Sequence, residues 1–298
     1  MTWRTLSLAG AVVLTLAGCT ASTPAKTAAT RAPEQALHDV AYATASPLEQ
    51  LDLYLPARAA RPAPLVIWIH GGGWRTGDKG SLTDDYNPAI VPPKPTVCNQ
   101  VVQAQTPDRA ALTAKGYAVA SINYRLTQDP IAAVQDAKAA VRFLRANASR
   151  YHLDPQRFAA WGDSAGGYSV IMLGLTGGRH TVFDDPALGN PTVSAGVQAV
   201  VDWFGPVEFA SMPGHLGPPE NPFTYTSAGK SLPPFKIANG DADCVVPLRE
   251  SRRLYTALTK AGASATLTVL PGAQHEDPAF MRTQLAPTVA FLDQTFGH

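Results

Sequence analysis

Residues 162–166 read Gly-Asp-Ser-Ala-Gly, a spacing in which the hydroxyl of Ser164 could act as a nucleophile. An apolar run at 158–161 precedes this segment, and an apolar run with helical character at 165–175 follows it. Glycines on both sides of the serine allow a sharp turn from strand to helix, which lifts the hydroxyl above the sheet. This context favours a nucleophilic serine over a glycine-rich turn whose serine only caps a helix.

Such a serine needs a base and an orienting acid, and both residue types follow later strands. His275 comes directly after Gly-Ala-Gln, beyond an apolar run at 265–270. A histidine in this place can take the serine proton while a carboxylate orients the imidazole. Two aspartates, Asp241 and Asp243, compete for the acid role after an apolar run at 235–238.

The remaining histidines are weaker candidates for the base. We expect His70 to bond the backbone of the glycine segment that follows it, because it stands at the start of that segment. The others fall in polar loops or near the chain ends, where a solvated side chain is expected: His38, His152, His180, His215 and His298.

Residues 70–74 read His-Gly-Gly-Gly-Trp and follow an apolar run at 64–69. Consecutive glycines allow backbone N–H groups to approach a developing oxyanion closely. We expect the donors to be the amides of Gly72 and Gly73, with Ala165 contributing from the serine turn and Trp74 as an alternative to Gly72. A phosphate-binding loop is disfavoured, because no Lys-Ser/Thr pair follows and the spacing G-x-G-x-x-G does not fit.

Strands and helices must alternate to hold these residues together. The expected strands are short apolar or alternating runs at 51–55, 64–69, 117–122, 158–161, 197–204, 235–238 and 265–270. The expected helices are an Ala-rich stretch ending at 116 and runs at 131–149, 165–175, 248–261 and 279–296. Repeated strand–helix–strand spacing predicts an α/β fold with a mostly parallel central sheet and helices on both faces. Such a sheet would gather residues that follow its strands at one edge.

Several segments together resemble one family. Beside the serine turn they are Ser-Ile-Asn-Tyr-Arg-Leu at 121–126, the helical segment 136–145, Leu-Asp-Pro-Gln-Arg at 153–157, and 233–247. With these, the chain is similar to α/β-hydrolase carboxylesterases of the hormone-sensitive-lipase-like and acetyl-xylan and feruloyl-esterase-like type. The resemblance implies the α/β-hydrolase fold with no large separate cap domain.

The chain order Ser164, Asp243, His275 is the order of the α/β-hydrolase triad. The family pattern G-x-x-D-x-x-V-P selects Asp243 as the acid and leaves Asp241 to close the turn through an Asx hydrogen bond. The segment 78–106 departs from the family, since it is longer than expected between the glycine loop and the next helix.

The resemblance implies a serine carboxylic-ester hydrolase that works through an acyl-enzyme. Its partners would be small-molecule esters of short or medium acyl groups, or acylated glycans, with no metal and no organic cofactor. An amidase or peptidase with the same triad and a non-catalytic binding protein of the cell envelope are the alternatives. Turnover of aryl amides would distinguish the first, and the complete set of serine, acid, base and glycine loop argues against the second.

The N-terminal residues indicate export. Arg4 is the single charge before an apolar run of twelve residues at 6–17, which fits a signal peptide and is too short to span a bilayer. Leu-Ala-Gly-Cys at 16–19 resembles a bacterial lipobox, so Cys19 is expected to carry a diacylglyceryl anchor that holds the protein at the outer side of the cell membrane. The expected organisation is a signal peptide at 1–18, a flexible tether at 19–33 and one hydrolase domain at 34–298.

Cysteine content and charge add two expectations. Apart from Cys19 only Cys98 and Cys244 remain, and in an oxidising compartment they allow a single disulfide. With 24 basic and 23 acidic side chains the formal charge is +1, so general electrostatic binding of nucleic acid is not expected. The oligomeric state does not follow from the sequence.

Overall fold

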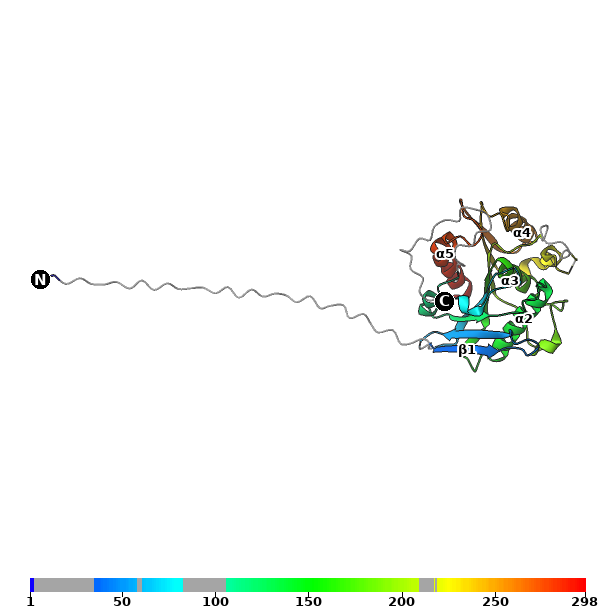
Figure 1. Ribbon diagram of the computed structural model, residues 1–298, viewed down its shortest axis with the longest axis horizontal. Helices are drawn as coiled ribbons and strands as arrows, with labels where there is room; N and C mark the ends of the chain where they lie inside the picture. Colours follow the sequence, from blue (N-terminus) through cyan, green and yellow to red (C-terminus); the bar gives the residue numbers. More distant parts are fainter. Residues whose placement is uncertain (3–34, 58–60, 83–105, 209–216, 218) are drawn as a thin grey trace. The chain divides into compact units, whose positions relative to one another are not determined.

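The computed structural model describes residues 1–2, 35–57, 61–82, 106–208, 217 and 219–298 (Figure 1). Its centre is an eight-stranded sheet in the order β1-β2-β4-β3-β5-β6-β7-β8. Strand β2 pairs antiparallel with β1 and β4, and all other neighbouring strands run parallel. The strands are β1 Gln35–Ala41, β2 Gln50–Leu55, β3 Ala63–Ile69, β4 Ala118–Ile122, β5 Leu153–Asp163, β6 Ala199–Trp203, β7 Phe235–Gly240 and β8 Ala265–Leu270.

Helices cover both faces of this sheet (Figure 1). One face packs against α1 and α5, and the other packs against α2, α3 and α4. The helices are α1 Arg109–Ala114, α2 Pro130–Ala146, α3 Ser164–Thr176, α4 Leu248–Lys260 and α5 Ala279–Phe296, with 3-10 turns η1 Lys79–Ser81, η2 Pro186–Leu188 and η3 Pro222–Ser231. The expected α/β-hydrolase architecture, with a mostly parallel sheet between two helical layers, is confirmed.

The central strands are apolar on both sides because both of their faces are covered. Every residue of β3 is buried, as is every residue of β4 and β6. On the α5 side, Trp68, Trp161 and Trp203 come from three adjacent strands and meet edge to face, with ring centroids 5.0–6.3 Å apart. Edge-to-face aromatic packing of this kind makes the middle of the sheet rigid where the strands approach their carboxyl ends.

Three basic residues of α2 fasten the loop 177–198 that leads into β6. Lys138, fully buried, bonds the carboxylate of Asp184 at 2.6 Å and the carbonyl of Thr176 at 3.1 Å. Arg142 donates to the carbonyls of Gly189 and Asp185, each at 3.1 Å. Arg145 donates to carbonyls further along the same loop and stacks over a phenylalanine ring. Helix α2, which contains the family-like segment 136–145, therefore also holds the loop 177–198 in place.

Most expected elements appear with small differences at their ends. Strand β5 begins five residues before the expected run, because Leu153 pairs with Ala63 of β3 ahead of an irregularity in the register. Strand β1 was not expected. It places His38 beside Asp52 at 3.1 Å, so this histidine lies in a strand and not in a loop, although its side chain is 58% exposed.

Several predictions fall on residues that the structure does not describe. The signal peptide, the tether and Cys19 lie outside the described residues, as do Cys98 and most of the segment 78–106. Of the described part, η1 and Thr106 flank the undescribed stretch 83–105, and Thr106 bonds the carbonyl of Ser81 at 3.2 Å. No helix in the described ranges is both long and apolar enough to cross a membrane.

Candidate active site

Ser164 lies at the junction where β5 ends and α3 begins. Its φ is +50°, a left-handed backbone conformation that is uncommon for serine and costs energy. Gly166 makes this turn possible, because a Cβ at that position would come within 2.0 Å of the Ile69 carbonyl oxygen of the neighbouring strand. The turn therefore has the geometry of a nucleophile elbow, with the serine raised at the carboxyl end of the sheet.

The structure brings Ser164, His275 and Asp243 together in one chain of hydrogen bonds. His275 Nε2 lies 3.0 Å from Ser164 Oγ, and His275 Nδ1 lies 2.8 Å from Asp243 Oδ2. The carboxylate can only accept, so Nδ1 carries a proton and Nε2 is left to accept from the serine hydroxyl. The Asp243 side chain is fully buried and the His275 side chain is 8% exposed, which keeps water from competing for these bonds.

The two aspartates after β7 bond different partners, and only Asp241 departs from the expectation. Asp243 closes its own turn, since its Oδ1 accepts from the amides of Val245 and Val246, both at 2.9 Å. Asp241 does not form an Asx turn; its Oδ1 accepts from the Gly272 amide at 2.6 Å, in the loop that carries the histidine. The expected Asx hydrogen bond at Asp241 is therefore wrong, and Asp241 instead ties the acid loop to the base loop.

The glycine segment folds into a tight loop after β3. Gly72, at φ +106°, has its carbonyl bonded by the amides of residues 75 and 76, and Gly73 is left-handed at φ +61°. His70 Nδ1 donates to the Gly71 carbonyl at 2.7 Å, as the sequence predicted. Burial lowers the pKa of His70, so the imidazole is neutral and serves as a brace. Ala165, the third expected donor, is buried in the first turn of α3 beside Ser164.

A second brace for this loop comes from the segment that directly follows β4. The hydroxyl of Tyr124 donates to the carbonyls of His70 at 3.0 Å and Gly71 at 3.1 Å, and its ring stacks on that of His70. Tyr124 belongs to the family-like segment 121–126, but its role here follows only from the fold. Burial raises the pKa of Tyr124 and keeps it a donor, and an ionised Asp163 would raise that pKa further.

Two acidic residues beside the serine and the histidine escaped the sequence reasoning. Asp163, immediately before Ser164, is buried, and burial followed by the charge of Glu276 raises its pKa well above the ordinary value. Glu276, immediately after His275, is half-buried with φ +56°, and burial also raises its pKa. Their adjacency to the two candidate residues was visible in the sequence, but nothing there indicated their burial or their proximity.

Aromatic residues close the site on the β6 side. Phe204, at φ +42°, packs edge to face against the His275 ring with centroids 4.7 Å apart. It is almost fully buried, whereas Trp203 next to it belongs to the tryptophan group in the core. Trp74 is also buried and packs against Tyr168. These aromatics shape the protein around the serine and histidine.

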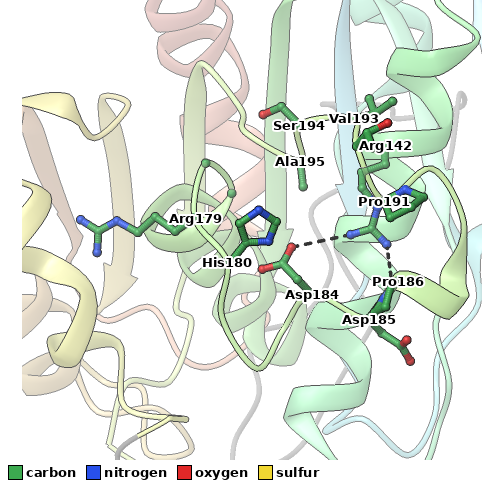
Figure 2. Close-up of a pocket in the computed structure, with 13 residues that line it drawn as sticks. Arg142, Arg179, His180, Asp184, Asp185, Pro186, Pro191, Val193, Ser194 and Ala195 are labelled. Atoms are coloured by element: carbon green, nitrogen blue, oxygen red, sulfur yellow. Dashed lines mark hydrogen bonds and ion pairs between the residues drawn. The ribbon is translucent and has the colours of Figure 1, made fainter.

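A cavity of about 510 Å³ lies at the opposite end of the sheet, along the loop 177–198 (Figure 2). Figure 2 shows Arg142 and Asp184 facing each other on its wall, while Arg179 points away from them. Neither Ser164 nor His275 lines this cavity. On this wall Asp184 accepts from Lys138 and Arg142 donates to the Asp185 carbonyl, and among the described residues no group of three or more His, Cys, Asp or Glu could hold a metal ion.

Comparison with known proteins points to one class of enzyme. The chain is 29% identical over 251 residues to carboxylesterase NlhH of Mycobacterium tuberculosis, which covers 75% of this chain and 69% of NlhH. It is 24% identical to esterase LipC of the same organism, over 78% of this chain and 59% of LipC. A solved structure described as a truncated form of a carbohydrate esterase from gut microbiota has a TM-score of 0.70 and 27% identity, covering 89% of this chain and 97% of that one.

The family described as BD-FAE matches residues 51–92 and 98–224, which is more than half of the chain. These ranges contain the glycine loop and the serine turn, while the acid and the base lie beyond them. The relatives are esterases, and the eight-stranded sheet is that of the esterase structures. The chain therefore belongs to the BD-FAE family and is an α/β-hydrolase carboxylesterase.

Proposed function

We propose that this esterase is a serine hydrolase in which Ser164 is the nucleophile, His275 the general base and Asp243 the orienting acid. The observation that carries the proposal is the unbroken chain of hydrogen bonds from Ser164 Oγ through the imidazole to the buried Asp243 carboxylate. Each of the three residues stands in a turn after its own strand, so the rigid sheet sets their separation. Such preorganisation is what converts an ordinary hydroxyl into a nucleophile.

In this mechanism His275 Nε2 takes the Ser164 proton as Oγ forms a bond to the ester carbonyl carbon. The carbonyl π electrons move to the oxygen, and we propose that the amides of Gly72, Gly73 and Ala165 donate to that oxyanion. Collapse breaks the bond to the alcohol, which leaves with the proton from the imidazolium, and an acyl-Ser164 remains. Water, deprotonated by His275, then attacks the acyl carbon and releases the acid and the free serine.

We infer that the substrates carry short or medium acyl groups or are acylated glycans. The similarity to a carbohydrate esterase of gut microbiota supports the glycan class, and the similarity to carboxylesterase NlhH supports small esters. Both classes use the same bond changes at Ser164. The chain length of the acyl group is the variable that the test must resolve.

The test is hydrolysis of p-nitrophenyl esters from acetate to decanoate and of acetylated and feruloylated oligosaccharides, by wild type and Ser164→Ala. Ser169→Ala is the matched control, because this serine lies in the same helix and only bonds the Ala165 carbonyl at 3.2 Å. We expect activity in wild type and Ser169→Ala, a loss of about 10⁴-fold or more in Ser164→Ala, and covalent paraoxon labelling of Ser164 by mass spectrometry. Wild-type enzyme that cleaves aryl amides in preference to every ester would favour an amidase, and labelling of a different serine would overturn the assignment.

We propose further that the protein is exported and held at the outer face of the cell membrane by a lipid on Cys19. The apolar run at 6–17 and the Leu-Ala-Gly-Cys segment support this. Expression in a bacterium with labelled palmitate should give a labelled protein in the detergent phase, and Cys19→Ser should lose both the label and the partition. Equal partition of the two forms would contradict the proposal.

A disulfide between Cys98 and Cys244 is proposed on the same ground of export. Cys244 follows Asp243 directly, so the bond would fasten the segment 78–106 beside the acid. Thiol counting on denatured, non-reduced protein carrying Cys19→Ser should find no free thiol, and two free thiols would overturn the pairing.

A further inference from the structure

We propose that Asp163 is a positioning residue for the glycine loop, and that it performs this role in its uncharged form. The inference rests on the proposed function, because it concerns the loop that would hold the oxyanion. It adds a residue that does not touch the substrate but determines where the backbone donors stand. Asp163 would connect the turn that carries the nucleophile to the loop that stabilises the charge formed on attack.

The first support is the close approach of Asp163 to Gly71. A Cβ placed on Gly71 would come within 2.9 Å of Asp163 Oδ2 and within 3.2 Å of both the Asp163 carbonyl oxygen and Ser164 Cβ. The first glycine of the loop therefore lies directly on the residues of the serine turn. The Gly71 backbone amide also bonds the Asp163 side chain, and this bond lowers the pKa of Asp163 against the larger opposing effect of burial.

The second support is that Asp163 sits where a charge is costly. Its side chain is buried, and its Oδ1 has no hydrogen-bond partner in the described part of the chain. An ionised carboxylate with one oxygen unpartnered is strongly disfavoured in a dry environment even when one amide bonds the other oxygen, whereas a neutral carboxyl group loses far less on burial. Asp163 is therefore expected to keep its proton at neutral pH, in contrast to Asp243, whose carboxylate accepts from two amides and an imidazole.

The third support is the ring of titratable groups around Asp163. Glu276 faces it from the loop after β8, and its negative charge adds to burial in raising the pKa of Asp163. On the side of β4, Tyr124 is close enough for Asp163 to raise its pKa. His70 in the glycine loop is neutral, and His275 stands beside Ser164. Among these described groups no cation is paired with Asp163.

These contacts define what ionisation of Asp163 would do. Tyr124 and His70 hold the Gly71 carbonyl from one side, and Asp163 meets the same glycine from the other side. A charged Asp163 would bond the Gly71 amide more strongly and would need a new donor or water at Oδ1, and both changes would move the glycine that begins the loop. Since the proposed donors of Gly72 and Gly73 follow directly, their alignment with the oxyanion would be lost.

The test compares kcat, KM and pH profiles of three variants on the best p-nitrophenyl ester. Asp163→Ala removes the contact, and kcat should fall about 10²-fold with KM changed by less than about threefold, as for the loss of an oxyanion donor. Asp163→Asn keeps an oxygen against Gly71 without a charge, so kcat at neutral pH should return to within about threefold of wild type.

The pH profiles, measured from about pH 6 to about pH 10, separate positioning from a general structural role. Wild type should lose kcat on the alkaline side as Asp163 ionises, and Asp163→Asn should not. Glu276→Gln removes a negative charge that opposes this ionisation, so the alkaline loss should move to lower pH. Removal of the Glu276 charge should therefore narrow the pH range over which kcat is high. A merely structural role for Asp163 would not produce this change.

Asp202→Asn is the matched control. Asp202 is the last residue but one of the neighbouring strand β6, is buried, has an unpartnered Oδ2 and accepts from the Gly205 amide at 2.8 Å, but it faces α3 and not the glycine loop. Its pH profile for kcat should match that of wild type. Paraoxon titration of active sites corrects every kcat for misfolded protein, so poor folding of Asp163→Ala cannot imitate the effect.

Three results would overturn the inference: equal alkaline profiles of wild type and Asp163→Asn, unchanged kcat in Asp163→Ala, or an alkaline shift in Asp202→Asn as large as that in Asp163→Asn. An inactive wild type that paraoxon does not label would instead refute the proposed function.

Discussion

The two ends of the sheet treat buried polar groups in opposite ways. At the amino end, where the parallel strands begin beside the loop 177–198, the buried basic side chains have hydrogen-bond partners. Backbone carbonyls or the Asp184 carboxylate accept from Lys138, Arg142 and Arg145. At the carboxyl end, three adjacent strands each finish near a buried side-chain oxygen without a partner in the described chain. These oxygens are Asp163 Oδ1 at the end of β5, Asp202 Oδ2 in β6 and Asn239 Oδ1 in β7.

Backbone strain shows the same contrast. Ser164, Phe204 and Glu276 all have left-handed φ values at the carboxyl end, and none of them is a residue type that favours this conformation. At the amino end, Asn190 has φ +48° and His152, directly before β5, has φ +54°, and asparagine and histidine are both residue types in which a positive φ is less uncommon. We infer from this difference that the residues at the amino end stabilise the fold. Those at the carboxyl end hold chemical groups in place at a cost in stability.

The largest test of this contrast is Asp243→Asn. At the carboxyl end the change should lower kcat about 10⁴-fold, because the amide can donate to His275 Nδ1 and so favours the wrong imidazole tautomer. The two bonds from the amides of Val245 and Val246 can still be accepted by the amide oxygen, so the melting temperature should change little. Steady-state kinetics and thermal melts measure both quantities, and a melting temperature that collapses together with the activity would break the comparison.

The next test asks whether the buried carboxyl group of Asp202, at the carboxyl end of the sheet, lowers the free energy of unfolding. Burial raises the pKa of Asp202 to about 8, so the folded protein retains a proton that the unfolded chain releases above about pH 4. The stability should therefore fall as the pH rises from about 4 to about 8, by about 4 kcal/mol at pH 7 from this group.

Asp202→Asn removes that dependence. We expect the variant to be about 2 kcal/mol more stable than wild type at pH 7, after a penalty for an amide N–H without an acceptor, and no more stable than wild type near pH 4. Urea unfolding at several pH values measures the difference. Parallel stability curves for the two proteins would show that Asp202 titrates normally.

Lys138→Met applies the same reasoning to the amino end. The variant leaves Asp184 partly buried with the Thr181 amide and hydroxyl as hydrogen-bond donors, at 2.9 and 3.2 Å, and with Arg142 as a more distant ion-pair partner at 3.7 Å. We expect a loss of about 2–3 kcal/mol in the free energy of unfolding, discounted because Asp184 is 22% exposed. The kcat per paraoxon-titrated site should stay within about twofold of wild type, since the change is remote from the triad.

Lys260→Met, at the exposed end of α4, controls for the loss of a positive charge and should alter neither quantity. A strong fall in kcat in Lys138→Met, with Lys260→Met unaffected, would mean that the two ends are coupled.

The parts of the molecule that the sequence predicted are those decided by local pattern. Strand β8 and helix α5 match the expected 265–270 and 279–296, because apolar periodicity and flanking glycine or proline mark their ends. Strand β1 was missed, since Gln35–Ala41 is a polar edge segment with few buried residues and becomes a strand only by pairing with β2. The early start of β5 was missed because Asp-Pro at 154–155 indicates a turn.

The residues of the site also fall into two groups: those that local sequence pattern predicts and those whose contacts depend on the packing of loops. Ser164 and His275 follow strands in recognisable segments, so their meeting was predicted from the topology of a parallel sheet. The burial of Asp163, its approach to Gly71 and the bond from Gly272 to Asp241 depend on how loops from different strands pack. No periodicity in the sequence records such contacts, and the expected Asx turn at Asp241 failed for this reason.

The smallest expected effect belongs to Asp241, which joins the two loops of the base and the acid. Asp241 is exposed and accepts from the Gly272 amide at 2.6 Å. Asp241→Ala should therefore lower the free energy of unfolding by about 1 kcal/mol or less. If this bond also sets the position of the histidine loop, kcat should fall about threefold to fivefold, which corresponds to about 1 kcal/mol in the transition state. Asp241→Asn keeps an acceptor oxygen and should restore both values. Equal losses in the two variants would assign the effect to the carboxylate charge, and an unchanged kcat in Asp241→Ala would place Asp241 with the purely stabilising contacts of the amino end.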